Sequence, residues 1–211
     1  MVVLDEECPN WRQVSIHESS PGERGVSRLL AEQCSDYTPT QFDPAIALGQ
    51  WNPGKQWRNE DLERQTFADE RFDLVISQDV MEHVFDIEAA FREIMRTLRP
   101  GGAHIFTTPL VNGRDGESRR SARRLEDGAI EHLEPAEYHG NPIDLEKGSL
   151  VTWKYGYDIV DIIREATGLE TSIILLDDMS RGIQGDYLEV LVTRKPSSEC
   201  PASPDISDSH H

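Results

Sequence analysis

The sequence predicts an α/β protein built on a doubly wound, mostly parallel sheet, with an antiparallel C-terminal strand and a lid-like insertion. The first observation is the nearly continuous apolar run at residues 72–77, which is typical of a strand covered on both faces. The second is residues 87–98, where apolar side chains three and four positions apart form one helical stripe. The third is a strand-like run at residues 103–108, directly after a Pro-Gly-Gly turn. A strand, a helix and a strand in this order predict a right-handed crossover between parallel strands.

The other elements follow from similar patterns. Asp86 stands where the N-cap of the helix at 87–98 is expected, and the Arg-Pro-Gly-Gly run after that helix is typical of a helix end. Pro21 suits the first position of a helix that reaches Cys34, and Gly168 ends another amphipathic pattern. The remaining elements are expected at residues 14–18 (strand), 23–34 (helix), 37–42 (short strand), 157–167 (helix) and 171–176 with 187–192 (a hairpin).

We expect a single domain over residues 1–196. Residues 43–58 are too rich in glycine and proline for a full helix, and residues 110–150 form a long polar insertion. Because a loop of that length in a compact domain is usually either a lid or without fixed structure, we interpret the insertion as a lid. Residues 197–211 are poor in apolar side chains and are predicted to be a disordered tail.

Composition argues against several kinds of partner. The chain has 39 acidic residues against 21 Lys and Arg, a formal net charge of −18, so we do not expect it to bind nucleic acid. No apolar run approaches the roughly 18 to 20 residues of a membrane span, and acids stand where a secretory signal would be basic. Cys8, Cys34 and Cys200 form no CxxC pair, which argues against a disulfide framework or a zinc site. We therefore expect a cytoplasmic protein without a membrane partner.

Residues 59–109 carry three motifs in order. These are an acid, Asp61, the run FDLVISQDVMEHV from Phe72, and the run LRPGGAHIFTTP from Leu98. Together they resemble class I S-adenosylmethionine-dependent methyltransferases of the small-molecule type, and with the flanking pattern the resemblance covers residues 13–195. It implies a Rossmann-like fold, S-adenosylmethionine as the cofactor, and methyl transfer to a small-molecule substrate.

The stretch HESSPGERG occupies the place of the family's glycine-rich cofactor turn. If Glu18 is aligned on the acid that ends the family's first strand, Ser20 and Gly22 fall at two glycine positions. At the third position Arg24 stands one residue ahead of Gly25. The resemblance implies that Glu18 anchors the amino group of the cofactor and that Ser20 and Gly22 contact its methionine part. Glycine is favoured there because the backbone approaches the ligand closely, often with positive φ.

Further cofactor contacts are implied at the ends of the next strands. Gln41 stands where most of the family has a ribose-binding acid, with Asp43 two residues later, and an amide binds a diol more weakly than a carboxylate does. Asp61 matches the acid that contacts the adenine ring, and Leu62 lies beside it. The fourth strand ends where ligands sit in open α/β sheets. The residues there are Gln78, Asp79 and Val80.

Catalysis requires alignment and, for some acceptors, a base. A neutral hydroxyl or amine must lose a proton on methylation, and a histidine with a pKa near ~6.5 can accept it. His139, in an insertion rich in aromatic and polar side chains, is the first candidate and His83 the second; an acidic thiol or enolate acceptor needs neither. No metal site is expected, because His132 and His139 are seven residues apart with no third ligand at metal spacing.

Two other functional classes compete with the methyltransferase hypothesis. The altered glycine turn favours a catalytically inactive methyltransferase-like domain that binds a ligand or a partner. A nicotinamide-dependent oxidoreductase is disfavoured, because it would carry GxGxxG after the first strand and an acid at the end of the second. The acceptor, the methylated atom and the oligomeric state stay open at this point.

Overall fold

The computed structural model describes residues 1–52, 54–114, 116–141 and 146–197. The tail predicted at 197–211 lies outside the described residues except for Ser197. Among the described helices, none is long and apolar enough to cross a membrane.

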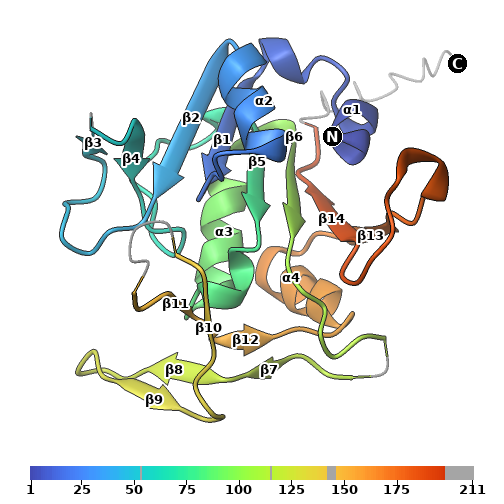
Figure 1. Ribbon diagram of the computed structural model, residues 1–211. Helices are drawn as coiled ribbons and strands as arrows, with labels where there is room; N and C mark the ends of the chain where they lie inside the picture. The colour runs from blue at the N-terminus through green and yellow to red at the C-terminus, as the bar shows by residue number, and fades with distance from the viewer. Residues whose placement is uncertain (53, 115, 142–145, 198–211) are drawn as a thin grey trace, which may run out of the picture.

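An eight-stranded sheet forms the centre of the molecule (Figure 1). Its strands are β1 (Ser15–Ser19), β2 (Asp36–Gln41), β3 (Trp51–Asn52), β4 (Trp57–Asn59), β5 (Phe72–Gln78), β6 (Leu98–Thr107), β13 (Thr171–Leu175) and β14 (Glu189–Arg194). They are ordered β13-β14-β6-β5-β1-β2-β4-β3. The strands from β6 to β4 run parallel, whereas β14 is antiparallel to β6, β13 to β14 and β3 to β4. This topology confirms the predicted doubly wound sheet with its antiparallel C-terminal strand.

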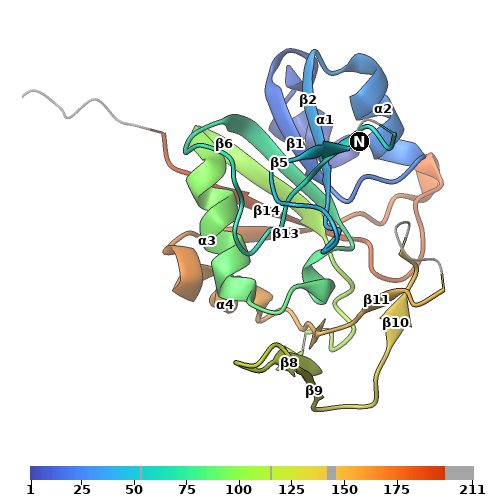
Figure 2. The same cartoon turned by 90° about the vertical axis from the view of Figure 1, so that its left-hand side faces the viewer.

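Helices cover both faces of the sheet (Figure 2). The helices are α1 (Val2–Glu7), α2 (Gly25–Gln33), α3 (Ile87–Thr97) and α4 (Ile159–Thr167), with short 3-10 turns η1 (Trp11–Gln13), η2 (Met81–His83) and η3 (Met179–Arg181). One apolar core joins α1 and α2 to the sheet through residues such as Leu30 and Ile16. A second joins α3 and α4 to the opposite face. Because β1 and β5 lie between the two cores, their side chains are buried on both faces of the sheet. This explains the nearly continuous apolar run of β5, whereas β1 buries the polar side chains of His17 and Glu18.

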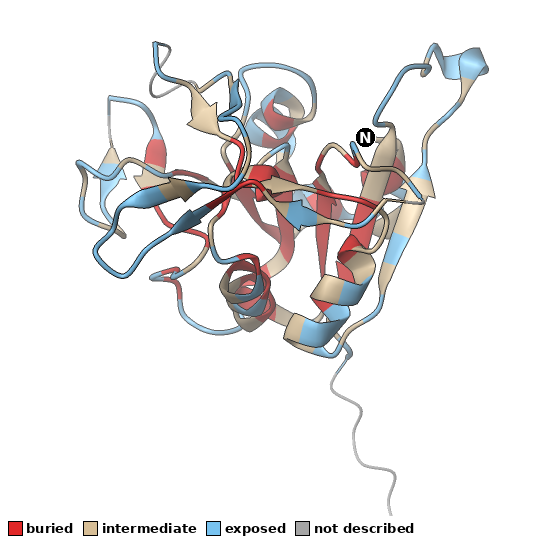
Figure 3. Cartoon of the chain, turned by 90° about the horizontal axis from the view of Figure 1, so that it is seen from below, coloured by how far each residue is buried: buried red, intermediate tan, exposed pale blue. Residues whose placement is uncertain are grey.

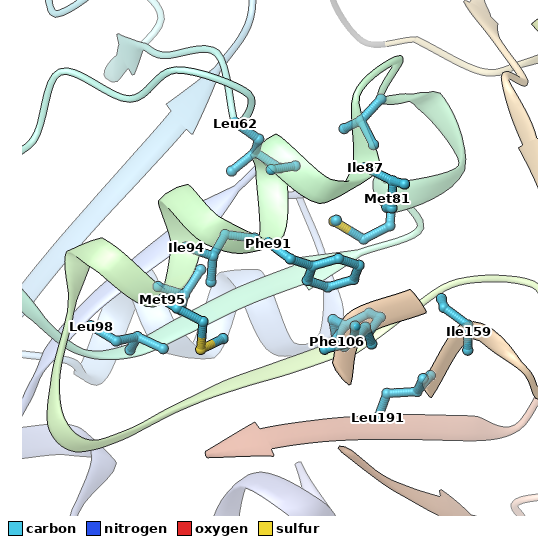
Figure 4. Close-up of a cluster of buried hydrophobic side chains, with 14 of the residues drawn as sticks. Leu62, Met81, Ile87, Phe91, Ile94, Met95, Leu98, Phe106, Ile159 and Leu191 are labelled. Atoms are coloured by element: carbon cyan, nitrogen blue, oxygen red, sulfur yellow. The ribbon is translucent and has the colours of Figure 1, made fainter. Parts of the chain in front are cut away.

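The helix α3 follows the predicted pattern closely. Asp86 caps it, since its side chain accepts a hydrogen bond from the Ala89 backbone N–H at 2.9 Å. Its apolar stripe is buried against the sheet and α4, with the Phe91 ring directed toward Phe106 of β6 (Figure 4). The Pro-Gly-Gly run is not a separate turn, however, but part of β6. A side chain at Gly102 would approach the backbone oxygen of Asp73 to 2.8 Å, so glycine is needed for close strand pairing.

Several predicted boundaries are wrong by a few residues. The helix expected at 23–34 begins at Gly25, with Arg24 as its N-cap, so Pro21 lies in the preceding loop and is not the first helical residue. The strand expected at 187–192 spans Glu189–Arg194. The helices α1 and η1 were not predicted, because each is too short to show a helical period.

The described part of the insertion contains short strands, which the sequence pattern does not predict. They are β7 (Arg119–Arg120), β8 (Ala122–Arg124), β9 (Ile130–His132), β10 (Tyr138–His139) and β11 (Ser149–Leu150), followed by β12 (Trp153–Lys154). They pair as β7 with β12, β8 with β9 and β10 with β11. This region lies at the carboxyl end of the parallel strands (Figure 1) and is largely exposed (Figure 3).

Candidate functional site

A cavity of about 1080 Å³ lies where the parallel strands end and the insertion begins. Its floor comes from the residues that follow β1, β2, β4 and β5, and its opposite wall from β9 to β11. Open parallel sheets bind ligands at this edge, and the volume suits a cofactor together with a small molecule. Nine of the eleven predicted site residues line the cavity: Ser20, Gly22, Gln41, Asp61, Leu62, Gln78, Asp79, Val80 and His83.

The loop after β1 has a glycine-type backbone at one of its two aligned glycine positions. Ser20 adopts φ 53°, the left-handed conformation in which glycine is usually found. Its hydroxyl donates to the side-chain oxygen of Gln41 at 3.1 Å, which joins the ends of β1 and β2. The Gly22 N–H donates to the hydroxyl of Ser27 at 3.0 Å. Serine thus occupies a glycine-type position and adds a hydrogen bond that glycine could not make.

Glu18 lies beneath the cavity and is not part of its lining. Its carboxylate accepts hydrogen bonds from Ser27 (2.6 Å), Gln78 (2.9 Å) and the Tyr37 hydroxyl (2.6 Å). Burial raises the pKa of Glu18, and these three donors act in the opposite direction. The carboxylate therefore positions the Gln78 amide and, through Ser27, the start of helix α2. Its contact with the amino group of the cofactor stays a prediction.

The second and third parallel strands supply the polar residues predicted for the ribose and adenine. Gln41 ends β2, and Asp43, two residues later, also lines the cavity. Asp61 follows β4 and is nearly buried; it accepts from the Glu63 N–H at 3.0 Å and from Arg64 at 3.2 Å. The cavity edge thus presents an amide and two carboxylates within one stretch of the sheet.

The residues after β5 form a second strained turn. Asp79 has φ 53°, an unusual value for a residue other than glycine, and its carboxylate accepts from the Thr107 hydroxyl at 3.0 Å. The backbone N–H of Asp79 also donates to the Thr107 carbonyl at 3.0 Å. Strained backbone at two neighbouring strand ends is a recurrent property of binding sites.

A cluster of Glu82, His83 and His139, which we call the EHH cluster, lies at the insertion side of the cavity. Glu82 Oε1 is 3.8 Å from His83 Nε2 and 3.8 Å from His139 Nδ1. The two imidazole rings meet edge to face, 5.2 Å between centroids. The structure therefore brings the two predicted candidate bases together, although His139 is not itself in the cavity lining.

The EHH cluster is electrostatically unusual. Burial raises the pKa of Glu82 to about 7, even though the Thr108 hydroxyl donates to its Oε2 at 3.0 Å. Burial also lowers the pKa of His83, whose Nδ1 lies 2.9 Å from the Leu150 carbonyl oxygen. Within the described residues these three side chains are also a group whose ligand atoms, all within 4.8 Å of one another, suit a metal ion.

Sequence reasoning missed Glu82 and most of the insertion wall. Glu82 precedes His83 directly, but nothing in the local sequence shows that it is buried beside a histidine 57 positions away in the chain. The wall residues also come from short strands without a clear period. Those missed in the insertion include Arg124 and Ile130.

Comparison with known proteins agrees with this geometry. Residues 18–106 match the family model of a methyltransferase domain. An S-adenosylmethionine dependent methyltransferase from Mesorhizobium loti aligns with a TM-score of 0.58 at 15% identity, covering 92% of this chain and 96% of that chain. One from Methanosarcina mazei gives 0.52 at 15% identity, with 90% and 96% covered. At such identities the similarity shows the fold.

A third solved structure has ligands bound. It is 1,6-didemethyltoxoflavin-N1-methyltransferase from Burkholderia thailandensis, with 1,6-didemethyltoxoflavin and S-adenosylhomocysteine. The TM-score is 0.51 at 14% identity, covering 93% of this chain and 76% of that chain. No curated protein matches this chain significantly.

Proposed function

We propose that the chain, whose residues 18–106 match a methyltransferase domain and whose fold is that of S-adenosylmethionine-dependent methyltransferases, transfers a methyl group to a small-molecule acceptor held between the sheet and the insertion. One observation carries this proposal. A single cavity is lined by nine of the residues predicted for cofactor and catalysis, and it extends from the β1 loop to the insertion. It is deep enough to hold a cofactor and an acceptor at the same time.

The cofactor fits the floor of the cavity in one direction. Its methionine part lies against Ser20 and Gly22, its ribose near Gln41, and its adenine against Asp61 and Leu62. This orientation follows the order of strand ends, β1, β2 and β4, along the sheet edge. The cofactor carries no phosphate, so the loop does not need the row of free amides that a nucleotide requires.

The acceptor then lies toward the insertion. That wall offers the Tyr138 ring, the Ile130 side chain and the charged Arg124, a mixture suited to a compact molecule with polar groups. The similar fold of a methyltransferase that binds 1,6-didemethyltoxoflavin supports an acceptor of this size class. A lid over it would exclude water from the reacting sulfonium.

Methyl transfer is an in-line displacement at carbon, and the protein contributes mainly by alignment. The EHH cluster lies at the acceptor side of the cavity, where the nucleophilic atom must be activated. His139 and His83 are the residues predicted to handle the proton of the acceptor.

Cofactor binding tests this proposal before any acceptor is known. We expect calorimetric titration with S-adenosylmethionine and S-adenosylhomocysteine to show one site per chain. Asp61→Asn should weaken binding by about 10- to 100-fold, because a charge-assisted hydrogen bond is lost. Glu165→Gln, on the exposed face of α4, is the matched control and should bind as the parent does. Absence of heat and of thermal stabilisation at millimolar cofactor would refute the proposal.

A further inference from the structure

We propose that Glu82, His83 and His139 bind one divalent transition-metal ion, which holds and activates an oxygen atom of the acceptor. The binding site is argued from the geometry of the EHH cluster alone, whereas the role of the ion in catalysis rests on the proposed function.

The distances suit coordination after a small contraction. The three ligand atoms lie within 4.8 Å of one another, and both nitrogens are 3.8 Å from Glu82 Oε1. Bonds of about 2.1 Å from a tetrahedral ion to nitrogen and oxygen place ligand atoms about 3.4 Å apart. Side-chain shifts well below the size of one atom would therefore close the site.

In each imidazole, the nitrogen nearer to Glu82 is the one left without a proton. His83 Nδ1 is 2.9 Å from the Leu150 carbonyl oxygen, which can only accept, so this nitrogen carries the proton and Nε2 does not. His139 Nε2 is 3.3 Å from the Glu137 carboxylate, which leaves Nδ1 facing Glu82. Metal-binding histidines commonly have their second nitrogen fixed by a carbonyl or a carboxylate in this way.

Glu82 gives the second, independent observation. The residue is 2% exposed, and its Oε2 accepts from the Thr108 hydroxyl. Its Oε1 is buried and has no hydrogen-bond partner, although it points at the two histidine nitrogens. An unsatisfied buried carboxylate oxygen facing two lone pairs is costly, and a cation between them would satisfy all three atoms.

The donor set indicates the kind of ion. Two imidazole nitrogens and one carboxylate favour Zn²⁺ or a neighbouring transition-metal ion over Mg²⁺ or Ca²⁺, which prefer oxygen. Three protein ligands leave a coordination position open for a substrate. Because His83 lines the cavity, that position is accessible from the acceptor side.

This assigns the acceptor class as a hydroxyl compound. Coordination lowers the pKa of a bound hydroxyl, which releases its proton to solvent. With the ion bound, His83 and His139 therefore assist the loss of this proton as metal ligands and not as general bases. The resulting oxygen attacks the methyl carbon, a C–O bond forms, the C–S bond breaks, and sulfur keeps the electron pair as a neutral thioether. The products are a methyl ether, S-adenosylhomocysteine and one proton.

Metal binding is tested on the full-length chain after treatment with a chelator. Two further histidines end the sequence, so the parent for this test carries His210→Ala and His211→Ala. We expect one Co²⁺ per chain by calorimetry, with the visible absorption of a low-coordinate cobalt site, displaced by Zn²⁺ and not by Mg²⁺. Glu82→Gln and His139→Ala should each weaken Co²⁺ binding at least about 100-fold, and Glu137→Ala about 10-fold.

His132→Ala is the matched control, since His132 lines the same cavity outside the EHH cluster; it should bind Co²⁺ like the parent. Thermal unfolding of each variant shows that the fold is retained, and Glu82→Gln preserves the side-chain shape. Absence of stoichiometric Co²⁺ binding, or Co²⁺ binding by the Glu82→Gln and His139→Ala variants that is as tight as that of the parent, would overturn the inference.

Cofactor titration of the metal-free protein separates the two proposals. Cofactor binding without metal binding refutes only the metal site, and metal binding without cofactor binding refutes only the methyltransferase.

Discussion

In the β1 loop, Ser20 has a backbone conformation typical of glycine although it carries a side chain. Ser20 adopts a left-handed backbone and donates to Gln41, so the strain of a side chain at this position is partly offset by a hydrogen bond. Gly22 differs, because its φ angle is not positive and a Cβ there would meet only the Ser27 hydroxyl, at 3.9 Å. The fold therefore tolerates a side chain at Gly22, and only a close ligand would require its absence.

Gly22→Ala separates these two requirements. We expect the free energy of unfolding to change by less than about 0.5 kcal/mol, because the added methyl group enters open space. If the methionine part of the cofactor lies against this backbone, affinity for S-adenosylhomocysteine should fall at least about 10-fold. Urea unfolding and calorimetry on the same preparation measure both quantities. Unchanged affinity would place the cofactor elsewhere in the cavity.

At the scale of elements, the segment that follows the insertion is hydrogen-bonded to the turn after β5. The Thr152 N–H donates to the Glu82 carbonyl at 2.8 Å, and the buried Tyr155 hydroxyl donates to the Met81 carbonyl at 2.9 Å. These bonds fix η2, and with it the side chains of Glu82 and His83, against the segment that closes the cavity. The wall for the acceptor and the EHH cluster are thus parts of one hydrogen-bonded unit.

The central strands make stability depend on pH. His17 of β1 and His104 of β6 are fully buried, and burial lowers the pKa of each to about 3. Both are neutral in the folded protein, whereas the unfolded chain binds their protons below pH 6.5. Stability is therefore complete above pH 6.5 and falls as the pH drops from there toward 3, by about 1.4 kcal/mol per pH unit for each histidine.

His104→Asn tests this account, because it retains a polar partner for Ser77, whose hydroxyl is 3.0 Å from His104 Nε2. Urea unfolding at pH 7.5, 6.0 and 5.0 should show a shallower loss of stability in the variant than in the parent. Parallel curves for the two proteins would show that His104 does not titrate on unfolding in this range.

An element is predicted well from the sequence when it depends on neighbouring residues, and poorly when it depends on contacts between distant parts of the chain. The strand β5 and the helix α3 have continuous or periodic apolar patterns, and both were predicted within a residue or two. Most of the residues predicted for the cofactor line one cavity, because they follow strands whose ends meet at one edge of the sheet. The EHH cluster was not, since it joins residues 82–83 to residue 139 through short strands whose pairing is determined by tertiary contacts.

At the scale of the whole molecule, two parts of the chain meet over one cavity. The sheet and its helices supply a floor with the fold of the similar methyltransferases, and described residues between Arg124 and Leu150 supply the opposite wall. The lid role of the insertion stays a prediction. The alternative of a ligand-binding domain without catalysis predicts cofactor binding without methylation of any acceptor.

Hydrogen–deuterium exchange with and without saturating S-adenosylhomocysteine tests the central claim most directly. The account predicts slower exchange in the β1 loop at residues 19–25, at residues 60–63 and 78–84, and also in the insertion at residues 130–141. Protection of the floor and the insertion together would support one cofactor and acceptor cavity. Protection confined to segments outside this cavity, or none at a cofactor concentration shown to saturate binding, would contradict it.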